Sequence, residues 1–470
     1  MFERNINMNY IVAKFGGTSL ANFEAMSRCA DIVLDSSDTR LVVVSASSGV
    51  TNLLVSLGRG TFDKQQCEEA VSKIRDIQHA IMAHLSLSEQ QRDHVDALLT
   101  RIAEISLILN VESNKTDTSI VNPLSDELLS FGEQLSSFLF TQVLIERGEK
   151  ASWFDVRDVM RTSSVVGKSV VNVEELKSLV DQKLLPQLEQ NVVVTQGFIG
   201  ADEHGVTTTL GRGGSDYSAA LLGEAINGSQ INIWTDVTGI FTTDPRITSQ
   251  AYALKEISFN EAAEMATFGA KVLHPSTLIP AMRKNIPVFV GSSRDPSAGG
   301  TIVRNETESK PVYRAIALRR EQTLVTVTSM DMLHAPGFLA RVFTILAKHN
   351  ISIDLVTTSE VSVALTLDDT GSNSSGKSQL SDELIDELKE ICQVNIQQDL
   401  ALVAIIGNAI DSSYGVGTRL FSSLPDVNVR MICQGASSHN LCFLVDGDQA
   451  TDVISRLHQS MFEQNTQGAA

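Results

Sequence analysis

The strongest constraint on the fold is an alternation of short apolar runs with longer stretches of helical periodicity, from residue 10 to about 300. The runs rich in β-branched residues are expected to be buried strands: YIVAKF (10–15), RLVVVSA (40–46), ASWFD (151–155), NVVVTQGF (191–198), INIWTD (231–236) and IPVFVGS (286–292). Helical segments such as 126–148 lie between them. This alternation predicts an α/β domain whose mostly parallel sheet carries helices on both faces. Such domains bind ligands at the carboxyl ends of their strands.

A different pattern follows RDPSAGGTIV (294–303), where two segments repeat the order strand, helix, strand, strand. They cover 323–368 and 400–446, and each continues into a further helix. The first copy has a closing strand, QVNIQQ (393–398), whereas the second runs into a polar tail. The run YRAIALRR (313–320) could supply the strand that the second copy lacks. The repeat therefore predicts two small modules, the first inserted within the second.

The composition excludes several classes of function. The 470 residues, 43% of them hydrophobic and only 10 of them proline, are enough for several domains with real cores. The 56 acidic residues outnumber the 37 basic ones, and the net charge of -19 disfavours binding to a nucleic-acid backbone or an anionic membrane. Apolar runs such as 400–407 are far shorter than the roughly 20 residues that span a bilayer, so no transmembrane helix is expected.

The N-terminus and the cysteines indicate a cytoplasmic protein. The first ten residues, MFERNINMNY, have neither a basic start nor an apolar core segment, so secretion is not expected. The five cysteines show no CxxC spacing, which is typical of reduced thiols. These observations direct attention to small-molecule chemistry.

Three predicted strand ends carry residues suited to a phosphate-bearing ligand. KFGGTS (14–19) places a lysine and two glycines after the first strand, although this motif alone is more typical of a tight turn. TLGRGGSDYSAALLGEAI (209–226) has a second glycine-rich turn that opens a helix, where backbone amides attract anions. INIWTDVTGIFTTDPR (231–246) ends a third strand in Thr-Asp. Together the three indicate a nucleotide site.

The ordered set KFGGTS (14–19), GVTNLL (49–54), GRGGSD (211–216), WTDVTGIFTTDPR (234–246) and FGAKVLHP (268–275) resembles the aspartate kinase family of the amino acid kinase fold. The resemblance covers nearly the whole chain, because the repeat is similar to the tandem ACT (βαββαβ) regulatory modules of that family. It implies a catalytic domain at 8–303, a strand at 312–320 contributed to the second ACT module, a first, effector-binding module at 321–399, and a second module at 400–464 that is mainly an interface. The monofunctional, lysine-inhibited members are the most similar.

The reaction implied is transfer of the γ-phosphoryl group of ATP to the β-carboxylate of L-aspartate, the first step toward lysine, threonine and methionine. Because the carboxylate is already an anion at neutral pH, no general base is needed, and the protein must align two anions and offset charge. The resemblance gives Lys14 and Asp216 catalytic roles, the first neutralising the phosphoryl group and the second orienting Lys14. A helix-capping role for Asp216 is compatible with this.

Further roles follow from the same resemblance. Arg212 would bind the α-carboxylate of aspartate and Glu133 its ammonium group, although alone Glu133 is more typical of a helix surface. The remaining substrate-binding positions are Ser45, Thr51, Gly213, Gly214 and Ser215. The ATP-binding positions are Lys14, Gly16, Gly17, Thr235, Asp236, Phe241, Arg246 and Lys271. Mg²⁺ is expected to arrive with ATP, held by phosphate oxygens and water, so no protein ligand is predicted for it.

The first module is expected to bind L-lysine as an allosteric inhibitor. The positions that match the family are Met332, Gly337, Phe338 and Leu339 on one side, and Ser352, Asp354, Thr358, Ser359 and Glu360 on the other. Helix-start amides near Gly337 suit the α-carboxylate of lysine, and the carboxylates suit its ammonium groups. The modules also imply a homodimer, with a tetramer as the alternative.

One motif gives a competing prediction. GSNSSGKS (371–378) matches the P-loop pattern, but Ser381, Asp382 and Glu383 have the composition of the following helix start, so Lys377 precedes the helix. A serine-rich connection is the simpler interpretation. Two other functions stay open: another kinase of the same fold, and a catalytically silent amino-acid sensor with ACT modules.

Overall fold

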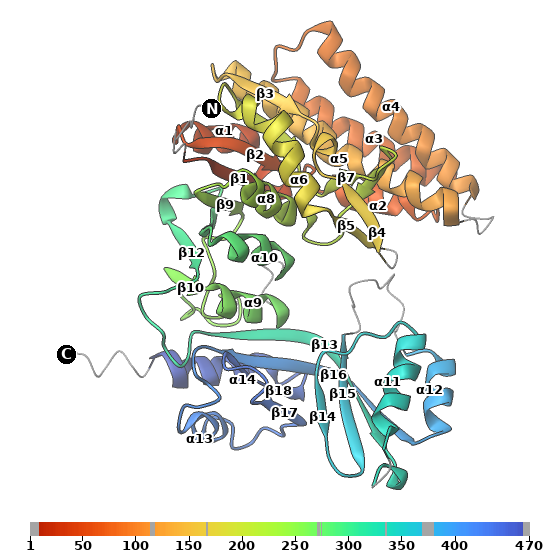
Figure 1. Ribbon diagram of the computed structural model, residues 1–470, viewed down its shortest axis with the longest axis vertical. Helices are drawn as coiled ribbons and strands as arrows, with labels where there is room; N and C mark the ends of the chain where they lie inside the picture. Colours follow the sequence, from red (N-terminus) through yellow and green to blue (C-terminus); the bar gives the residue numbers. More distant parts are fainter. Residues whose placement is uncertain are drawn as a thin grey trace. The chain divides into compact units, whose positions relative to one another are not determined.

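The computed structural model describes residues 9–112, 118–165, 168–269, 273, 275–333, 336–368 and 380–463 (Figure 1). It divides into two compact units, each described by itself. The first unit consists of Met1–Ile240, Ala253–Phe259 and Val272–Glu306, and the second of Phe241–Tyr252, Asn260–Lys271 and Thr307–Ala470.

The first unit is built on an eight-stranded sheet with the order β10-β12-β11-β9-β1-β2-β6-β3. The strands are β1 Ile11–Phe15, β2 Thr39–Val44, β3 Ala151–Phe154, β6 Val192–Gln196, β9 Gln230–Thr235, β10 Glu256–Ser258, β11 Val288–Ser292 and β12 Gly300–Arg304. All neighbours are parallel except β11 and β12. The six strands predicted from the sequence are all present, and the mostly parallel α/β fold is confirmed.

Helices cover both faces of this sheet (Figure 1). On one side pack α1 Phe23–Leu34, α2 Val50–Gly58, α3 Lys64–Met82, α4 Glu89–Glu112 and α5 Thr118–Glu146; on the other lie α6 Val173–Leu179, α7 Leu185–Leu188, α8 Gly214–Ala225 and α10 Pro275–Lys284. Two small hairpins, β4 Thr162–Val165 with β5 Lys168–Val171 and β7 Ile199–Ala201 with β8 Thr207–Thr209, complete the unit.

Strand alternation decides which side chains of β1 reach the site. Ala13 and Phe15 belong to the core shared with α1–α5. Val12 and Lys14 point the other way, because successive side chains of a strand lie on opposite faces. Val12 accordingly lies beside Gly223 of α8, where a Cβ would be 3.6 Å from Val12 Cγ2. Lys14 therefore faces the helix that carries Asp216.

Helix α5 has the length and composition of a membrane span but lies in a hydrophobic core. Among the described residues, its Pro123–Glu146 segment is long and apolar enough to cross a membrane. The sequence analysis did not single it out, because polar residues are spread among the apolar ones and no long unbroken apolar run is visible. In the structure 83% of the most apolar window is buried, which identifies α5 as the central helix of the first unit's core.

The second unit contains a six-stranded sheet with the order β14-β15-β13-β16-β18-β17. Its strands are β13 Ala315–Thr328, β14 Val356–Thr358, β15 Ser362–Asp368, β16 Gln393–Ile406, β17 Met431–Gln434 and β18 Asn440–Asp446. Its helices include α9 Phe259–Thr267, α11 Phe338–Lys348, α12 Asp382–Lys389, α13 Val416–Ser422 and α14 Ala450–His458. Two separate hydrophobic cores lie under the two halves of the sheet.

The long strands β13 and β16 pass through both halves. Residues 315–319 pair with 402–406 in the second module, and residues 324–328 pair with 393–397 in the first. At the junction, Glu321 and Asp399 adopt left-handed backbone conformations with φ of 57° and 56°, which breaks the register between the halves. Residues 315–319, within the segment 313–320, thus form a strand beside residues 402–406 of the second copy of the repeat.

Candidate active site

Lys14 and Asp216 form an ion pair at the carboxyl end of β1. Lys14 is the fourth residue of the strand and lies between Val43 of β2 and Ile233 of β9. Its Nζ atom is 2.5 Å from Oδ1 of Asp216, in the first turn of α8, and the two side chains are 10% and 16% exposed. Low exposure strengthens the attraction. The pair fixes a cation where the parallel strands end.

Glycines bring the loops of this site close together. The Gly16 amide donates to the Trp234 carbonyl oxygen at 3.1 Å, which ties the first turn to β9. A Cβ on Gly17 would lie 2.9 Å from the Ala46 carbonyl oxygen, so only glycine fits. Gly213 caps α8 with φ of 70°, in the region that favours glycine. Backbone amides at the start of the 3₁₀ helix that follows β1, and at the start of α8, therefore lie at one edge of the sheet. An anion can bind there.

Phe198 is a residue of this site that the sequence analysis missed. It has φ of 70°, a strained conformation for a bulky side chain. Its amide donates to Ser218 Oγ at 3.0 Å, and its carbonyl oxygen accepts from the Leu210 amide at 2.8 Å. A Cβ on Gly214 would lie 2.8 Å from the Phe198 ring, so the ring presses on the start of α8. The NVVVTQGF run gave no signal for this, because phenylalanine there is typical of a strand.

Glu133 of α5 is buried, with 3% of the residue exposed. Its Oε1 accepts from the Ala46 amide at 3.0 Å, and Oε2 has no hydrogen-bond partner among the described residues. Burial raises the pKa of Glu133 to about 8, against the opposing effects of the Ala46 amide and the Lys14 charge. A helix-surface role is therefore wrong for Glu133. A buried carboxyl group with one unsatisfied oxygen is suited to a cationic ligand.

The other predicted substrate residues lie on the loops around this edge. The Ser45 amide donates to the Phe15 carbonyl oxygen at 3.1 Å. The Ser45 carbonyl oxygen accepts from Ser136 Oγ at 2.8 Å. Thr51 is exposed in the first turn of α2, and Arg212 is exposed on the loop between β8 and α8. Ser215 packs tightly on Gly197, where a Cβ would lie 2.6 Å from Ser215 Cβ.

The predicted nucleotide residues are divided between the two units. Thr235 ends β9 in the first unit, and its Oγ1 donates to Asp236 Oδ1 at 3.2 Å. Phe241 and Arg246 belong to the second unit. Arg246 pairs with Asp244 at 2.6 Å and keeps 86% of its side chain exposed. Lys271 lies outside the described residues.

The predicted effector residues surround the start of α11 and the strand β14. Gly337 caps α11 with φ of 90°, but the Phe338 side chain is only 3% exposed and packs in the module core, so only its backbone can face a ligand. Asp354 pairs with Arg319 at 3.2 Å. The other predicted effector residues are close to these in the chain. Met332 ends the 3₁₀ helix Met330–Met332, and Leu339 is 36% exposed. The remaining four, Ser352, Thr358, Ser359 and Glu360, are exposed.

The P-loop-like segment 371–378 lies outside the described residues.

Comparison with known proteins identifies the family. The model of the amino acid kinase family matches residues 9–292, and an ACT domain model matches residues 325–373 and 403–461. The chain is 54% identical to the lysine-sensitive aspartokinase 3 of Escherichia coli (strain K12) over 453 residues, which cover 96% of this chain and 99% of that protein. The chain belongs to the aspartokinase family. A more distant aspartokinase, aspartokinase 3 of Arabidopsis chloroplasts, is 35% identical over 467 residues, covering 97% of this chain and 82% of that one.

Solved aspartokinase structures share the fold. The E. coli aspartokinase III structure with aspartate and ADP, described as the R-state, has a TM-score of 0.88 at 54% identity and covers 96% of this chain and 100% of that one. The T-state structure of that enzyme with lysine and aspartate has a TM-score of 0.81 at 53% identity, covering 97% of this chain and 100% of that one. The amino acid kinase fold followed by ACT modules is thereby confirmed for this aspartokinase-family chain.

Proposed function

We propose that this chain is an aspartate kinase that transfers the γ-phosphoryl group of ATP to the β-carboxylate of L-aspartate, giving 4-phospho-L-aspartate, and that L-lysine inhibits it. The observation that carries the proposal is the buried pair of Lys14 and Asp216 beside the glycine turns, in a chain 54% identical to a lysine-sensitive aspartokinase over nearly its whole length. The place in metabolism is the first step from aspartate toward lysine, threonine and methionine.

The chemistry assigned to Lys14 is charge compensation. Two anions, the β-carboxylate and the γ-phosphate, must approach each other, and negative charge on the moving phosphoryl group must be offset. Lys14 supplies a positive charge, Asp216 holds that charge in place, and the backbone amides that follow Gly16 at the start of the turn add hydrogen-bond donors. None of these groups needs to gain or lose a proton during transfer.

Aspartate would be held by its two groups that do not react. The exposed guanidinium of Arg212 suits the α-carboxylate through paired donors, with the amides after Gly213 beside it. The buried carboxyl group of Glu133 suits the α-ammonium group, which would ionise it by supplying the missing positive charge. Ser45, Thr51, Gly214 and Ser215 complete the assigned pocket.

ATP would be held by Thr235 and Asp236 together with Phe241, Arg246 and Lys271. Mg²⁺ is assigned to the phosphate oxygens of ATP and to water, because this ion gives up its water reluctantly and usually binds with the phosphates of its substrate. When bound with ATP, the ion would help to neutralise the phosphates. Removing it with a chelator should abolish turnover, and adding it back should restore turnover.

We assign lysine binding to the ACT modules. We also propose that these modules form a homodimer, with a tetramer as the alternative, and that the protein works in the cytoplasm without binding membranes.

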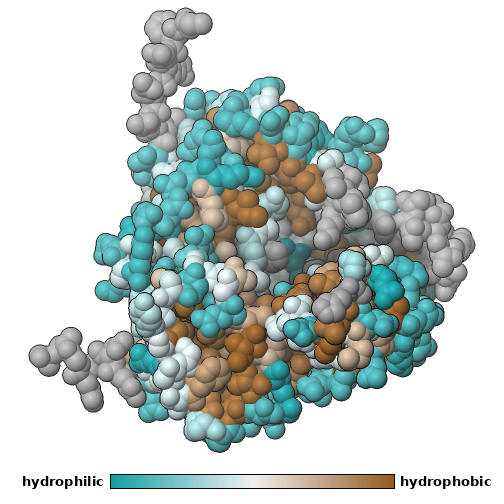
Figure 2. Space-filling view, turned by 60° about the horizontal axis from the view of Figure 1, so that its bottom comes forward, coloured by the Kyte–Doolittle hydropathy of each residue, from teal (hydrophilic) through white to brown (hydrophobic). Residues whose placement is uncertain are grey.

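Figure 2 shows apolar areas exposed between hydrophilic ones on the face that it presents. The exposed apolar side chains of the second unit include Met330, Val356 and Ile432, at 73%, 41% and 40% exposure, and β14 is an edge strand of its sheet. An exposed edge of this kind favours pairing with another chain. Light scattering after size-exclusion chromatography, with and without lysine, measures the assembly.

One assay tests the function. The purified chain is incubated with aspartate, ATP and Mg²⁺, the acyl phosphate is trapped with hydroxylamine, and lysine and threonine are titrated separately. We expect hydroxamate formation that lysine suppresses. Lysine binding without any acyl phosphate would instead support the silent amino-acid sensor, and activity on a different carboxylate would support another kinase of this fold.

A further inference from the structure

The strand β8 carries three consecutive threonines, and their hydroxyl groups have different partners. Thr207 and Thr209 lie on one face of the strand and Thr208 on the other, as alternation requires. Thr208 Oγ1 is 2.8 Å from Thr162 Oγ1 of β4. Thr207 and Thr209 bond instead to groups connected with α5. The strand is therefore held from two sides by separable bonds.

Thr209 is tied directly to α5. Its Oγ1 donates to Asp126 Oδ1 at 2.7 Å. Burial raises the pKa of Asp126, and the hydrogen bonds from the Thr209 hydroxyl and backbone oppose that rise. Because Asp126 is mostly shielded from water, Thr209 is a partner that it cannot easily replace with solvent.

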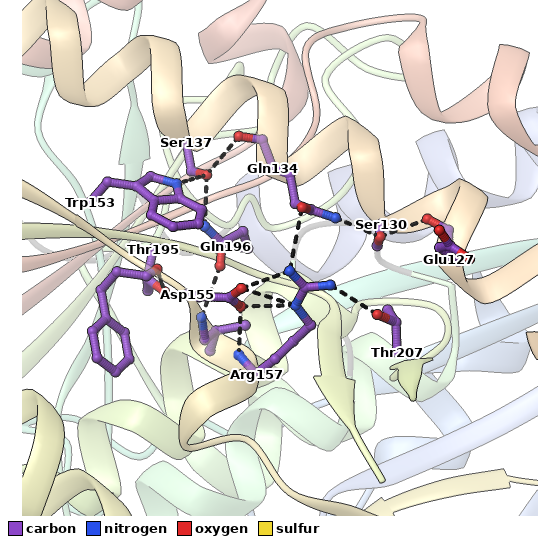
Figure 3. Close-up of polar contacts among 12 residues, drawn as sticks. Glu127, Ser130, Gln134, Ser137, Trp153, Asp155, Arg157, Thr195, Gln196 and Thr207 are labelled. Atoms are coloured by element: carbon purple, nitrogen blue, oxygen red, sulfur yellow. Dashed lines mark hydrogen bonds and ion pairs between the residues drawn. The ribbon is translucent and has the colours of Figure 1, made fainter. Parts of the chain in front are cut away.

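Thr207 is tied to α5 through Arg157, as Figure 3 shows. Arg157 Nη1 donates to Thr207 Oγ1 at 2.9 Å, and Nη2 donates to Gln134 Oε1 at 3.4 Å. Asp155 fixes the guanidinium by accepting from Nε at 2.9 Å and from Nη2 at 2.6 Å. Arg157 thus bridges the strand and the helix.

Hydrogen bonds to α5 also hold the backbone next to Arg157 (Figure 3). The amide of Val156 donates to Gln196 Oε1 at 2.9 Å, and Gln196 Nε2 donates to Ser137 Oγ of α5 at 2.9 Å. Trp153 Nε1 donates to the same Ser137 Oγ at 2.9 Å. These bonds hold the backbone that carries Arg157, so the bridge has little freedom to shift.

The two ends of this network adjoin the two residues assigned to the substrate. Gln134 follows Glu133 on α5, and Arg212 comes three residues after Thr209. We propose that Thr207 and Thr209, with Arg157 and Asp126, are positioning residues that set the spacing between Glu133 and Arg212, and so the fit of an α-amino acid between them. This inference rests on the proposed function, because it uses the aspartate-binding roles of Glu133 and Arg212. Poor positioning should weaken aspartate binding and leave the ATP interaction unchanged.

The test uses the full-length chain and steady-state kinetics with L-aspartate and ATP varied separately. The variant Thr207→Val with Thr209→Val keeps the β-branched shapes and removes both hydroxyl groups that lead to α5. Thr208→Val is the matched control, because it removes a hydroxyl group from the same strand that bonds to β4 instead. We expect the double variant to raise KM for aspartate about tenfold, KM for ATP to stay within about twofold, and the control to match the parent.

A conservative change separates positioning from general destabilisation. Asp126→Asn keeps an oxygen that can accept from Thr209, so its KM for aspartate should stay near the parent value, whereas Asp126→Ala should raise it. A parent chain that makes no acyl phosphate would overturn the proposed function and this inference with it. A parent that turns over, combined with equal KM values for aspartate in the double variant and Thr208→Val, would overturn the inference alone. A parallel rise in KM for ATP would do the same.

Discussion

At the scale of single residues, the site uses burial to give ordinary side chains unusual properties. The Lys14 and Asp216 charges are stabilised by each other in a place that water hardly reaches. In the part of the chain that the structure describes, Glu133 has no such partner for its second oxygen, and its pKa is raised to about 8. The unliganded site therefore holds a carboxyl group that is neutral at pH 7 and becomes charged when a cation arrives.

The raised pKa of Glu133 predicts a pH dependence. Below about pH 8 the free protein holds Glu133 protonated, and aspartate binding requires the carboxylate, so kcat/KM for aspartate should rise about tenfold per pH unit up to that value and then level off. Glu133→Gln should lower kcat/KM by about 10- to 100-fold and remove this dependence. A flat parent profile between pH 6 and about 9 would contradict the assignment.

The two candidate phosphate lysines give opposite expectations. Lys14→Ala removes the buried cation and should reduce kcat by about a thousandfold, whereas Lys377→Ala, in the P-loop-like segment, should leave turnover unchanged. Hydroxamate formation at saturating aspartate and ATP measures both. Survival of turnover in the first variant and its loss in the second would show that the phosphate site has been assigned to the wrong lysine.

At the scale of elements, the packing of α5 on the loop after β2 sets the position of Glu133. Gly132 precedes Glu133, and a Cβ there would lie 2.7 Å from Ala46 Cβ and 3.3 Å from Leu54 Cδ1. The helix approaches the loop so closely only because this residue has no side chain. The hydrogen bond from the Ala46 amide to Glu133 depends on the same approach.

Gly132→Ala should have two opposing effects on stability, a gain from helix propensity and a loss from overpacking. Alanine would favour the helix by about 1 kcal/mol, but overpacking at a buried contact costs about 1–3 kcal/mol. We expect a lower midpoint of thermal unfolding and a higher KM for aspartate. Gly58→Ala is the control, because its Cβ would meet only Leu128 Cδ2 at 3.8 Å and Ser125 Oγ at 4.0 Å. A variant Gly132→Ala as stable and active as Gly58→Ala would contradict this account.

At the scale of the whole molecule, the assigned ATP residues occur in both compact units, and the effector residues occur in the second. Phe241 and Arg246 belong to the unit that contains the ACT modules. A ligand can inhibit from a separate site only by binding two conformations with different affinity. Lysine should therefore act by stabilising one conformation of the second unit.

The effector site predicts a separation of inhibition from catalysis. Asp354→Ala removes a carboxylate that would bind an ammonium group of lysine, and also the partner of Arg319. We expect the lysine concentration for half inhibition to rise about tenfold or more while uninhibited turnover is retained. Asp386→Ala, at an exposed carboxylate of α12 paired with Lys389 at 3.5 Å, is the control from the same module. Unchanged inhibition in Asp354→Ala would reject this pocket.

The local elements and the fold class could be predicted from the amino-acid sequence. Strand runs such as YIVAKF and the repeat after residue 320 follow from hydrophobic periodicity, which depends only on near neighbours in the chain. The glycine turns at 16–17 and 213–214 were visible for the same reason. The family resemblance then gave the roles of Lys14, Asp216 and Glu133, which periodicity could not supply.

Contacts between residues far apart in the chain could be seen only in the folded structure. It placed Asp216 against Lys14, buried Glu133, strained Phe198 and tied the threonines of β8 to α5. It also made the apolar α5 a core helix, although its composition would suit a membrane span. These outcomes depend on the packing of elements separated by tens to hundreds of residues. Local sequence patterns do not specify such long-range contacts.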